Sequence, residues 1–78
     1  MIVKESKDVV KYLKSRQLEL VYLKTKKYLE HDFIKKVALK LRKPKNSGIY
    51  QFRITKKYRA LAVKKDKTLY VFHISDHQ

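Results

Sequence analysis

Apolar and polar residues follow a helical spacing in much of the first half of this chain of 78 residues and strand-like alternation in the second half. The first five residues, Met1 to Glu5, begin like a β-strand. After them, apolar side chains recur at helical spacing, while Ser6 is of the type that caps a helix N-terminus and Asp8 suits a first turn. The pattern predicts an opening strand followed by a first helix over about residues 6–16.

Two more helical segments are predicted before the middle of the chain. From residue 17 to residue 29, apolar side chains recur three or four positions apart, and lysines occupy most of the remaining positions. A break at His31 is followed by a third helical repeat over residues 33–41. This repeat cannot continue through Pro44, which lies in a basic loop of residues 43–48 with strong turn chemistry.

The segment from residue 49 to residue 63 reads as two strands joined by a basic turn. A three-residue turn would place Arg53 opposite Arg59 and would set two aromatic side chains against alanines. A two-residue turn would shift the register by one position and send the two arginines to opposite faces. We favour the three-residue turn, because in that register large side chains face small ones. It predicts the pairs Tyr50 with Ala62, Phe52 with Ala60, Arg53 with Arg59 and Ile54 with Tyr58.

The last strand, from Leu69 to Ser75, has apolar residues on both faces, which is typical of a strand in the middle of a sheet. Its alternation sets Tyr70, Phe72 and Ile74 against the remaining residues. No repeat, low-complexity tract or linker divides the chain. We therefore predict a single α+β domain over residues 1–78, with an N-terminal strand and two to three helices packed on a small, mainly antiparallel sheet.

Charge narrows the range of partners. The chain has 21 Lys and Arg residues against 7 Asp and Glu residues, a formal net charge of +14. This exceeds the magnitude of about 2 to 8 that is usual for a small soluble domain. The electric field of so large a positive charge accelerates encounters with polyanions and gives a salt-sensitive affinity for phosphate backbones. Nucleic acid or an acidic protein is therefore the expected partner. A lysine-rich surface with no specific partner remains the simpler alternative.

Several classes of protein are excluded by what the sequence lacks. It has no cysteine, so neither a disulfide framework nor a thiolate zinc site can form. The longest apolar run, Leu20 to Leu23, is too short for a membrane span or a signal peptide. His31, His73 and His77 do not have the spacing of zinc ligands. We expect a cytoplasmic protein without a targeting segment, a membrane partner, a metal or a cofactor.

Two arginines and a histidine are the candidate catalytic residues. Cleavage of a phosphodiester without metal needs cations for the phosphate and a titratable group for proton transfer. Arg53 and Arg59 can bind phosphate oxygens bidentately through their planar guanidinium groups. A histidine such as His77, with a reference pKa of about 6.5, can give or take a proton at neutral pH. These residues favour RNA cleavage by attack of a ribose 2′-OH on the adjacent phosphate.

In order along residues 47–78, the same residues form a motif that resembles a known family. The motif consists of Ser47-Gly48, aromatic residues, Arg53-Ile54-Thr55, Tyr58-Arg59 and a histidine after the last strand, His77. It is similar to the RelE/YoeB branch of the RelE/ParE toxin superfamily. This resemblance implies a RelE-like fold and a toxin of a type II toxin–antitoxin system. Such a toxin is a ribosome-dependent endoribonuclease that cuts mRNA in the A site and is silenced by a cognate antitoxin.

The resemblance also assigns roles to individual residues. Arg53 and Arg59 stand at the positions of the family's active-site arginines, and His77 stands at that of its catalytic histidine. Substrate binding falls to the basic loop and to polar neighbours of the motif, at Lys43, Lys45, Gln51 and Gln78. The implied partners are an acidic cognate antitoxin, the ribosome and mRNA, and a homodimer is left open.

Four positions depart from the family pattern. Gln78 stands in place of an aromatic residue, and Lys40 stands near the place of the carboxylate that acts as general base in YoeB-like members. Gln51 replaces a lysine of RelE-type members, and Ala62 replaces the usual strand tyrosine. Two alternatives therefore stay open: a non-catalytic member of the same fold, such as a gyrase inhibitor or an inactive toxin, and a basic nucleic-acid-binding domain.

Overall fold

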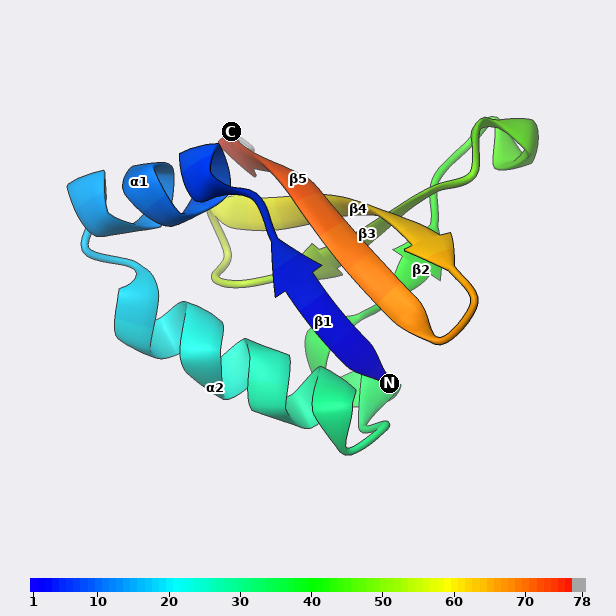
Figure 1. The fold of residues 1–78 in the computed structure, drawn as a ribbon, viewed down its shortest axis with the longest axis horizontal. Helices are drawn as coiled ribbons and strands as arrows, with labels where there is room; N and C mark the ends of the chain where they lie inside the picture. Colours follow the sequence, from blue (N-terminus) through cyan, green and yellow to red (C-terminus); the bar gives the residue numbers. More distant parts are fainter. Residues whose placement is uncertain (77–78) are drawn as a thin grey trace.

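A computed structural model describes residues 1–76 and shows an α+β fold of two helices and a five-stranded mixed sheet (Figure 1). The predicted α+β class is thereby confirmed. His77 and Gln78, two residues of the predicted site, lie outside the described residues. The elements in chain order are β1 (Ile2–Glu5), α1 (Lys7–Ser15), α2 (Glu19–Glu30), the 3₁₀ turn η1 (Ile34–Val37), β2 (Lys40–Leu41), the 3₁₀ turn η2 (Lys45–Ser47), β3 (Ile49–Arg53), β4 (Tyr58–Lys65) and β5 (Thr68–Asp76).

The two helices begin and end within two residues of the predicted bounds. The Ser6 hydroxyl accepts a hydrogen bond from the Val9 N–H at 3.2 Å, which satisfies one of the free N–H groups at the start of α1. Gln17 then adopts a left-handed backbone conformation, with φ of 57°, and this interrupts the helical path between α1 and α2. The predicted N-terminal strand and both first helices are confirmed.

The strands are arranged in the order β1-β5-β4-β3-β2. Only β1 and β5 run parallel, and the other three pairs are antiparallel. β5 therefore has a neighbour on each side, as its two apolar faces predicted. The predicted register of the β3–β4 hairpin is also confirmed, with Arg53 opposite Arg59 and the two aromatic residues opposite alanines. The turn is closed by a hydrogen bond of 3.0 Å from the Ile54 N–H to the Tyr58 carbonyl.

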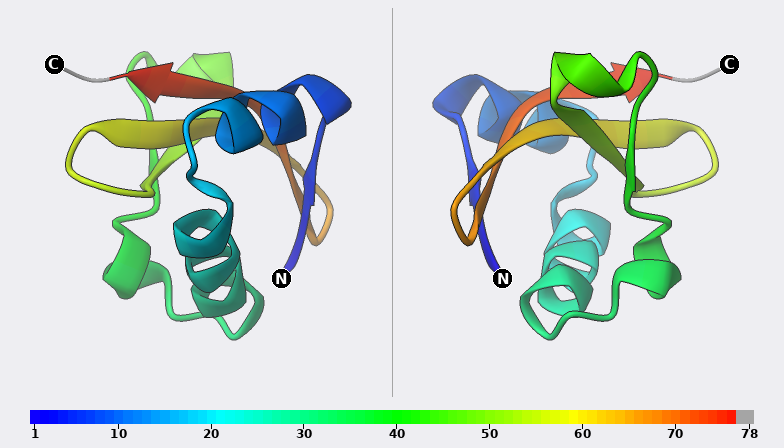
Figure 2. Two further views of the ribbon diagram at one scale, coloured as in Figure 1. Left: turned by 90° about the vertical axis from the view of Figure 1, so that its left-hand side faces the viewer. Right: turned by 90° about the vertical axis from the view of Figure 1, so that its right-hand side faces the viewer.

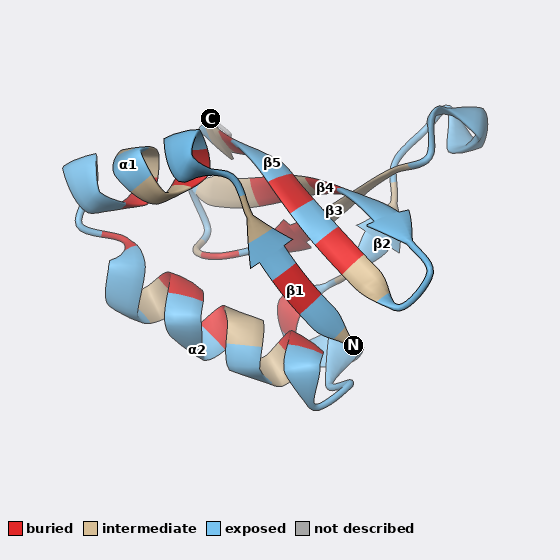
Figure 3. Cartoon of the chain, viewed as in Figure 1, coloured by how far each residue is buried: buried red, intermediate tan, exposed pale blue. Residues whose placement is uncertain are grey.

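One hydrophobic core joins both helices to one face of the sheet. Val9 and Leu13 from α1 and Leu29 from α2 are buried together with Phe52 and Leu69 from the strands. Figure 2 shows α2 on one side of the sheet in both views, and Figure 3 shows buried and exposed positions alternating along β1 and β5. We call the other side of the sheet the open face. By strand register it carries Lys4, Lys40, Ile49, Gln51, Arg53, Arg59, Leu61, Val63, Tyr70, His73 and Ser75.

The predicted third helix over residues 33–41 is wrong. The segment forms only the single 3₁₀ turn η1 and then enters β2. Ala38 takes a left-handed conformation, with φ of 52°, which ends the turn, and Leu41 then pairs with Tyr50 of β3. The helical spacing here does not match burial, because Phe33 and Ile34 are 56% and 43% exposed. Pairing with the edge of the sheet therefore outweighs a short local periodicity.

The predicted alternation along β5 is also wrong after Val71. Val71 lies opposite Ala62 and His73 lies opposite Leu61, so Phe72 is an extra residue, as in a β-bulge. The bulge places Phe72 and His73 as consecutive exposed residues, with Val71 buried before them and Ile74 buried after them. Ile74 consequently joins the core face, and we include Phe72 in the open face.

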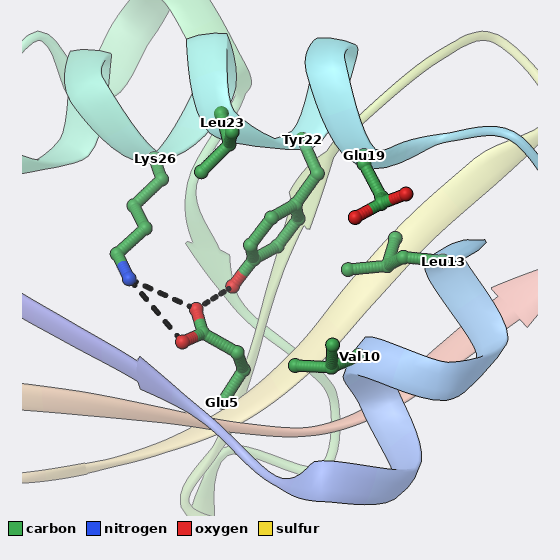
Figure 4. A pocket seen from close by; sticks show the side chains of 7 residues that line it. All are labelled: Glu5, Val10, Leu13, Glu19, Tyr22, Leu23 and Lys26. Carbon is green, nitrogen blue, oxygen red and sulfur yellow. Dashed lines mark hydrogen bonds and ion pairs between the residues drawn. The ribbon is translucent and has the colours of Figure 1, made fainter.

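A polar network lies between β1 and α2. The Tyr22 hydroxyl donates a hydrogen bond to Glu5 Oε1 at 2.8 Å, and Lys26 Nζ contacts both Glu5 oxygens at 3.1 and 3.2 Å (Figure 4). Apolar side chains of α1 and α2 surround the three residues. Burial, followed by the hydrogen bond to the Glu5 carboxylate, raises the pKa of Tyr22 above its ordinary value of 10.0. Both oxygens of Glu5 have partners, which indicates a structural role for this network.

We expect Tyr22→Phe to lower the free energy of unfolding by about 1.5–3 kcal/mol near neutral pH, the range for a hydrogen bond to a charged group. The raised pKa keeps the phenol protonated in the folded chain, whereas the unfolded chain loses this proton above pH 10.0. The stabilisation from Tyr22 is therefore complete below that pH and is lost as the pH rises through the higher folded-state pKa. Urea unfolding at about pH 7 and at about pH 11 measures both effects.

Tyr70→Phe is the matched control, because the Tyr70 ring is 40% exposed on the open face. Its unfolding free energy should stay within about 0.5 kcal/mol of wild type. Equal unfolding curves for Tyr22→Phe and Tyr70→Phe would contradict a stabilising role for the network.

Within residues 1–76, neither helix has the length and apolar character needed to cross a membrane.

Candidate nucleic-acid interface

The β3–β4 hairpin positions the arginine pair. Arg53 is the last residue of β3 and Arg59 is the second residue of β4, and the two are direct cross-strand partners. The turn between them is held by the Thr55 hydroxyl, which accepts hydrogen bonds from the N–H groups of Lys57 and Tyr58 at 3.2 and 3.1 Å. A rigid turn of this kind keeps two guanidinium groups on neighbouring strands at one end of the open face.

Contacts of Tyr58 and Lys57 anchor the hairpin to the rest of the fold. The Tyr58 ring meets the Tyr12 ring of α1 edge to face, with centroids 6.3 Å apart. Lys57 Nζ lies 3.8 Å from Asp76 Oδ2 at the end of β5. Because Asp76 is also the cross-strand partner of Tyr58, the end of β5 lies beside the arginine pair. The open face at this point is therefore built from three adjacent strands.

No acidic side chain of residues 1–76 stands at an open-face strand position. Glu5 belongs to the network with α2, and Asp76 pairs with Lys57. The other acidic residues lie on the helices or in turns: Asp8, Glu19, Glu30, Asp32 and Asp66. The ion pairs found within the described residues involve the N-terminal amine, Lys26 and Lys57, and they include neither arginine. Two adjacent like charges without a carboxylate partner form a site that favours an anion.

The structure separates the predicted substrate-binding residues into two groups. Gln51 lies on β3, two residues before Arg53, opposite Leu61 on one side and Lys40 on the other. Lys43 and Lys45 lie in the loop that precedes β3, whereas Arg53 ends that strand. Figure 1 shows this loop and the β3–β4 turn at opposite ends of the sheet. Lys43 and Lys45 are thus not beside the arginine pair, and they can contact only a different part of a bound strand.

Sequence reasoning missed two cations near Arg53. Lys24 of α2 and Lys36 of η1 line, together with Arg53, a hollow of about 230 Å³ between the helix and the free edge of β3. β2 pairs only with Tyr50 and Gln51, so the edge of β3 is uncovered at Arg53. The helical pattern placed Lys24 on a solvated face, and no local signal linked it to a strand more than twenty residues later.

Chemically, this end of the open face can hold a phosphate. Arg53 and Arg59 supply planar donor groups, and Lys24 and Lys36 add charge beside Arg53 at the edge of the sheet. Within the part of the chain that the structure describes, no group of three or more His, Asp or Glu side chains gathers in the way that metal ligands do.

Comparison with known proteins does not assign the chain to a family. No protein-family model matches it, and a search of the curated proteins finds no match. A function is therefore inferred from the site itself and from the resemblance over residues 47–78.

Proposed function

We propose that this protein is a type II toxin with a RelE-like fold, an endoribonuclease that cuts mRNA on the ribosome. The observation that carries the proposal is the cross-strand pair of Arg53 and Arg59 in a chain of net charge +14. Within residues 1–76, no acidic side chain shares a strand position on the face that carries this pair. The element order gives further support, because one strand and two helices precede four antiparallel strands. The resemblance implies an N-terminal strand and two to three helices on a small, mainly antiparallel sheet.

The proposed reaction is an internal transfer of the phosphate. The 2′-oxygen of one ribose attacks the adjacent phosphorus, a new P–O2′ bond forms, and the P–O5′ bond breaks. Arg53 and Arg59 hold the non-bridging oxygens, whose negative charge grows in the transition state. His77 exchanges a proton with the attacking or the departing oxygen. The products are a 2′,3′-cyclic phosphate and a 5′-hydroxyl end, and the step needs no oxidant or second substrate.

The proposal includes the partners that such a toxin requires. Ribosome-bound mRNA is the substrate, and a cytoplasmic location follows from it. A cognate antitoxin of acidic character is the regulator, since a net charge of +14 attracts an acidic protein.

Cleavage of mRNA on programmed ribosomes tests the function. We expect the purified protein to cut the message in the presence of EDTA and to leave 2′,3′-cyclic phosphate ends, which mapping of the fragment ends identifies. An intact message after incubation with folded protein at saturating concentration would overturn the proposal.

One observation favours a second candidate, a non-catalytic member of the same superfamily. Lys40 lies opposite Gln51 on the open face, near the position where the YoeB pattern has its carboxylate. A protein without a base at this place could act by contact alone, for example on gyrase. Inhibition of gyrase supercoiling by a preparation that leaves ribosome-bound mRNA intact would select this candidate.

A further inference from the structure

Two large aromatic side chains of β5 are exposed on the open face. Tyr70 and Phe72 are 40% and 45% exposed. Tyr70 lies between Lys4 of β1 and Val63 of β4, whereas Phe72 lies just past the end of β1 and lines a hollow with Asp8, Val9 and Tyr12 of α1. The ring contacts found among residues 1–76 join other side chains, namely Tyr12 with Tyr58, Tyr28 with Phe33 and His31 with Phe33. Large exposed rings are costly to hydrate, and neighbouring exposed rings are typical of a binding surface.

The bulge in β5 makes this arrangement possible. In a regular strand, residues 70 and 72 share a face with residue 74, which here is the buried Ile74. The extra residue at Phe72 breaks that alternation, so Tyr70 and Phe72 remain exposed while Ile74 enters the core. Beside the rings lie Val63, the cross-strand partner of Tyr70, and His73, which follows Phe72. The centre of the open face is therefore aromatic and apolar.

Cations surround this centre. Arg53 and Arg59 lie at one end of the face, and Lys4 is the partner of Tyr70 on the parallel strand β1. At the other end lie the basic loop before β3 and the turn between β4 and β5. Together these two segments contribute Arg42, Lys43, Lys45 and Lys65. Lys64 and Lys67 instead line a hollow with Asp32 and Asp66. From Arg59 to Val63 along β4 the span is about 13 Å at the usual rise per residue.

We propose that the open face binds single-stranded RNA, with bases stacked on Tyr70 and Phe72 and with backbone phosphates on the cations at both ends. This inference rests on the proposed function in one respect: the strand it holds is the one whose phosphate lies at Arg53 and Arg59. It adds a subsite away from the scissile phosphate. It also gives Lys43 and Lys45 a role that fits their distance from the arginine pair.

The chemistry of the face favours a single strand over the alternatives. Unpaired bases expose π-faces that stack on aromatic side chains, whereas the bases of a duplex are already stacked on one another. An acidic protein would be attracted by the same charges but has no need of two flat rings at the centre of the face. The combination of aromatic centre and cationic ends therefore points to a single-stranded nucleic acid.

Binding of a labelled 2′-O-methyl RNA strand tests the inference without cleavage, because this strand lacks the attacking 2′-OH. We expect Tyr70→Ala and Phe72→Ala each to weaken its binding by about 5- to 150-fold, the range for loss of one base–aromatic stack. The salt dependence of binding should stay unchanged in both variants, because neither side chain contacts phosphate. Arg53→Ala, in contrast, should reduce the slope of log K against log salt by about 0.7. Fluorescence anisotropy over a salt series measures both quantities.

Three controls make the result specific. Phe33→Ala removes an exposed ring that is not on the open face and should bind as wild type. Tyr70→Phe keeps the ring and should lose much less affinity than Tyr70→Ala. A duplex of the same length should bind more weakly than the single strand, and its affinity should not respond to Tyr70→Ala. Circular dichroism verifies that each variant is folded.

The outcomes separate this inference from the proposed function. Ring-dependent binding of the 2′-O-methyl strand by a protein that cuts no mRNA would support the inference and overturn the nuclease. Cleavage of mRNA with wild-type binding by the Tyr70→Ala, Phe72→Ala double variant would overturn the inference and leave the nuclease standing. Equal losses of affinity for the RNA strand and for polyglutamate in that double variant would also overturn it, since the face would then recognise an acidic polymer rather than bases.

Discussion

Replacing either Arg53 or Arg59 with alanine is expected to slow mRNA cleavage by about 10²- to 10³-fold, the usual cost of removing one preorganised donor from a developing oxyanion. Both guanidinium groups stand on neighbouring strands whose turn is fixed by Thr55, so neither has to be recruited when the phosphate becomes more negative. Single-turnover cleavage rates at saturating ribosome concentration measure this effect apart from binding.

The stability of the same variants distinguishes a functional arginine from a structural one. Like charges directly opposite each other on paired strands are destabilising, by roughly 0.2–1 kcal/mol. Arg53→Ala and Arg59→Ala should therefore melt at the same temperature as wild type or above it, while their cleavage rates fall. If the arginines had a structural role, the substitutions would lower both the melting temperature and the cleavage rate.

Two further variants sharpen the test. Lys11→Ala removes an equal charge from the exposed face of α1 and should leave the cleavage rate nearly unchanged. Arg53→Lys keeps the charge but lacks the planar fork, and an intermediate rate is expected. Arg53→Ala and Arg59→Ala rates within about threefold of the Lys11→Ala rate would remove the arginine pair from the reaction.

The parts of the fold that sequence predicted correctly are those that depend on close neighbours along the chain. Ser6 marks the start of α1 because a capping hydroxyl acts on a residue only three positions later. The β3–β4 register follows from side-chain size within one hairpin, where Phe52 meets Ala60. These signals are local, so they need no knowledge of the remaining structure.

The errors in the fold come from contacts between distant segments. Leu41 belongs to β2 because it pairs with Tyr50 at the edge of the sheet. No signal within residues 33–41 predicts this pairing with β3. The bulge at Phe72 depends on how β5 fits against β4, which alternation within β5 does not encode. That irregularity moved Ile74 to the core face and His73 to the open face.

The candidate site likewise has parts that local sequence predicts and parts that depend on contacts between distant segments. The pairing of Arg53 with Arg59 was predictable from the hairpin alone. The distance of Lys43 and Lys45 from this pair was not, because it follows from the orientation of a loop that leads from β2 into β3. The approach of Lys24 and Lys36 to Arg53 depends on how α2 packs against the sheet edge, and composition can predict only that some lysines will be nearby.

Removal of the imidazole in His77→Ala is expected to lower the cleavage rate by about 10²- to 10⁴-fold, the contribution of a positioned proton-transfer group. An alkoxide is a poor leaving group at neutral pH, so the 5′-oxygen needs a proton as its bond to phosphorus breaks. In the wild-type protein one limb of the pH–rate profile should come from the titration of an imidazole. That limb should disappear in His77→Ala, and added free imidazole should restore part of the rate.

The other histidines provide controls of the same residue type. His31 lies at the end of α2, and its replacement by alanine should leave the rate and the pH profile as in wild type. His73 lies opposite Leu61 on the open face, so His73→Ala can alter the affinity for RNA but should keep the imidazole limb of the profile at saturating substrate. If this limb persists in His77→Ala and vanishes in His73→Ala, the proton-transfer role belongs to the histidine on β5, and the assignment from the resemblance to RelE/YoeB toxins is wrong at this position.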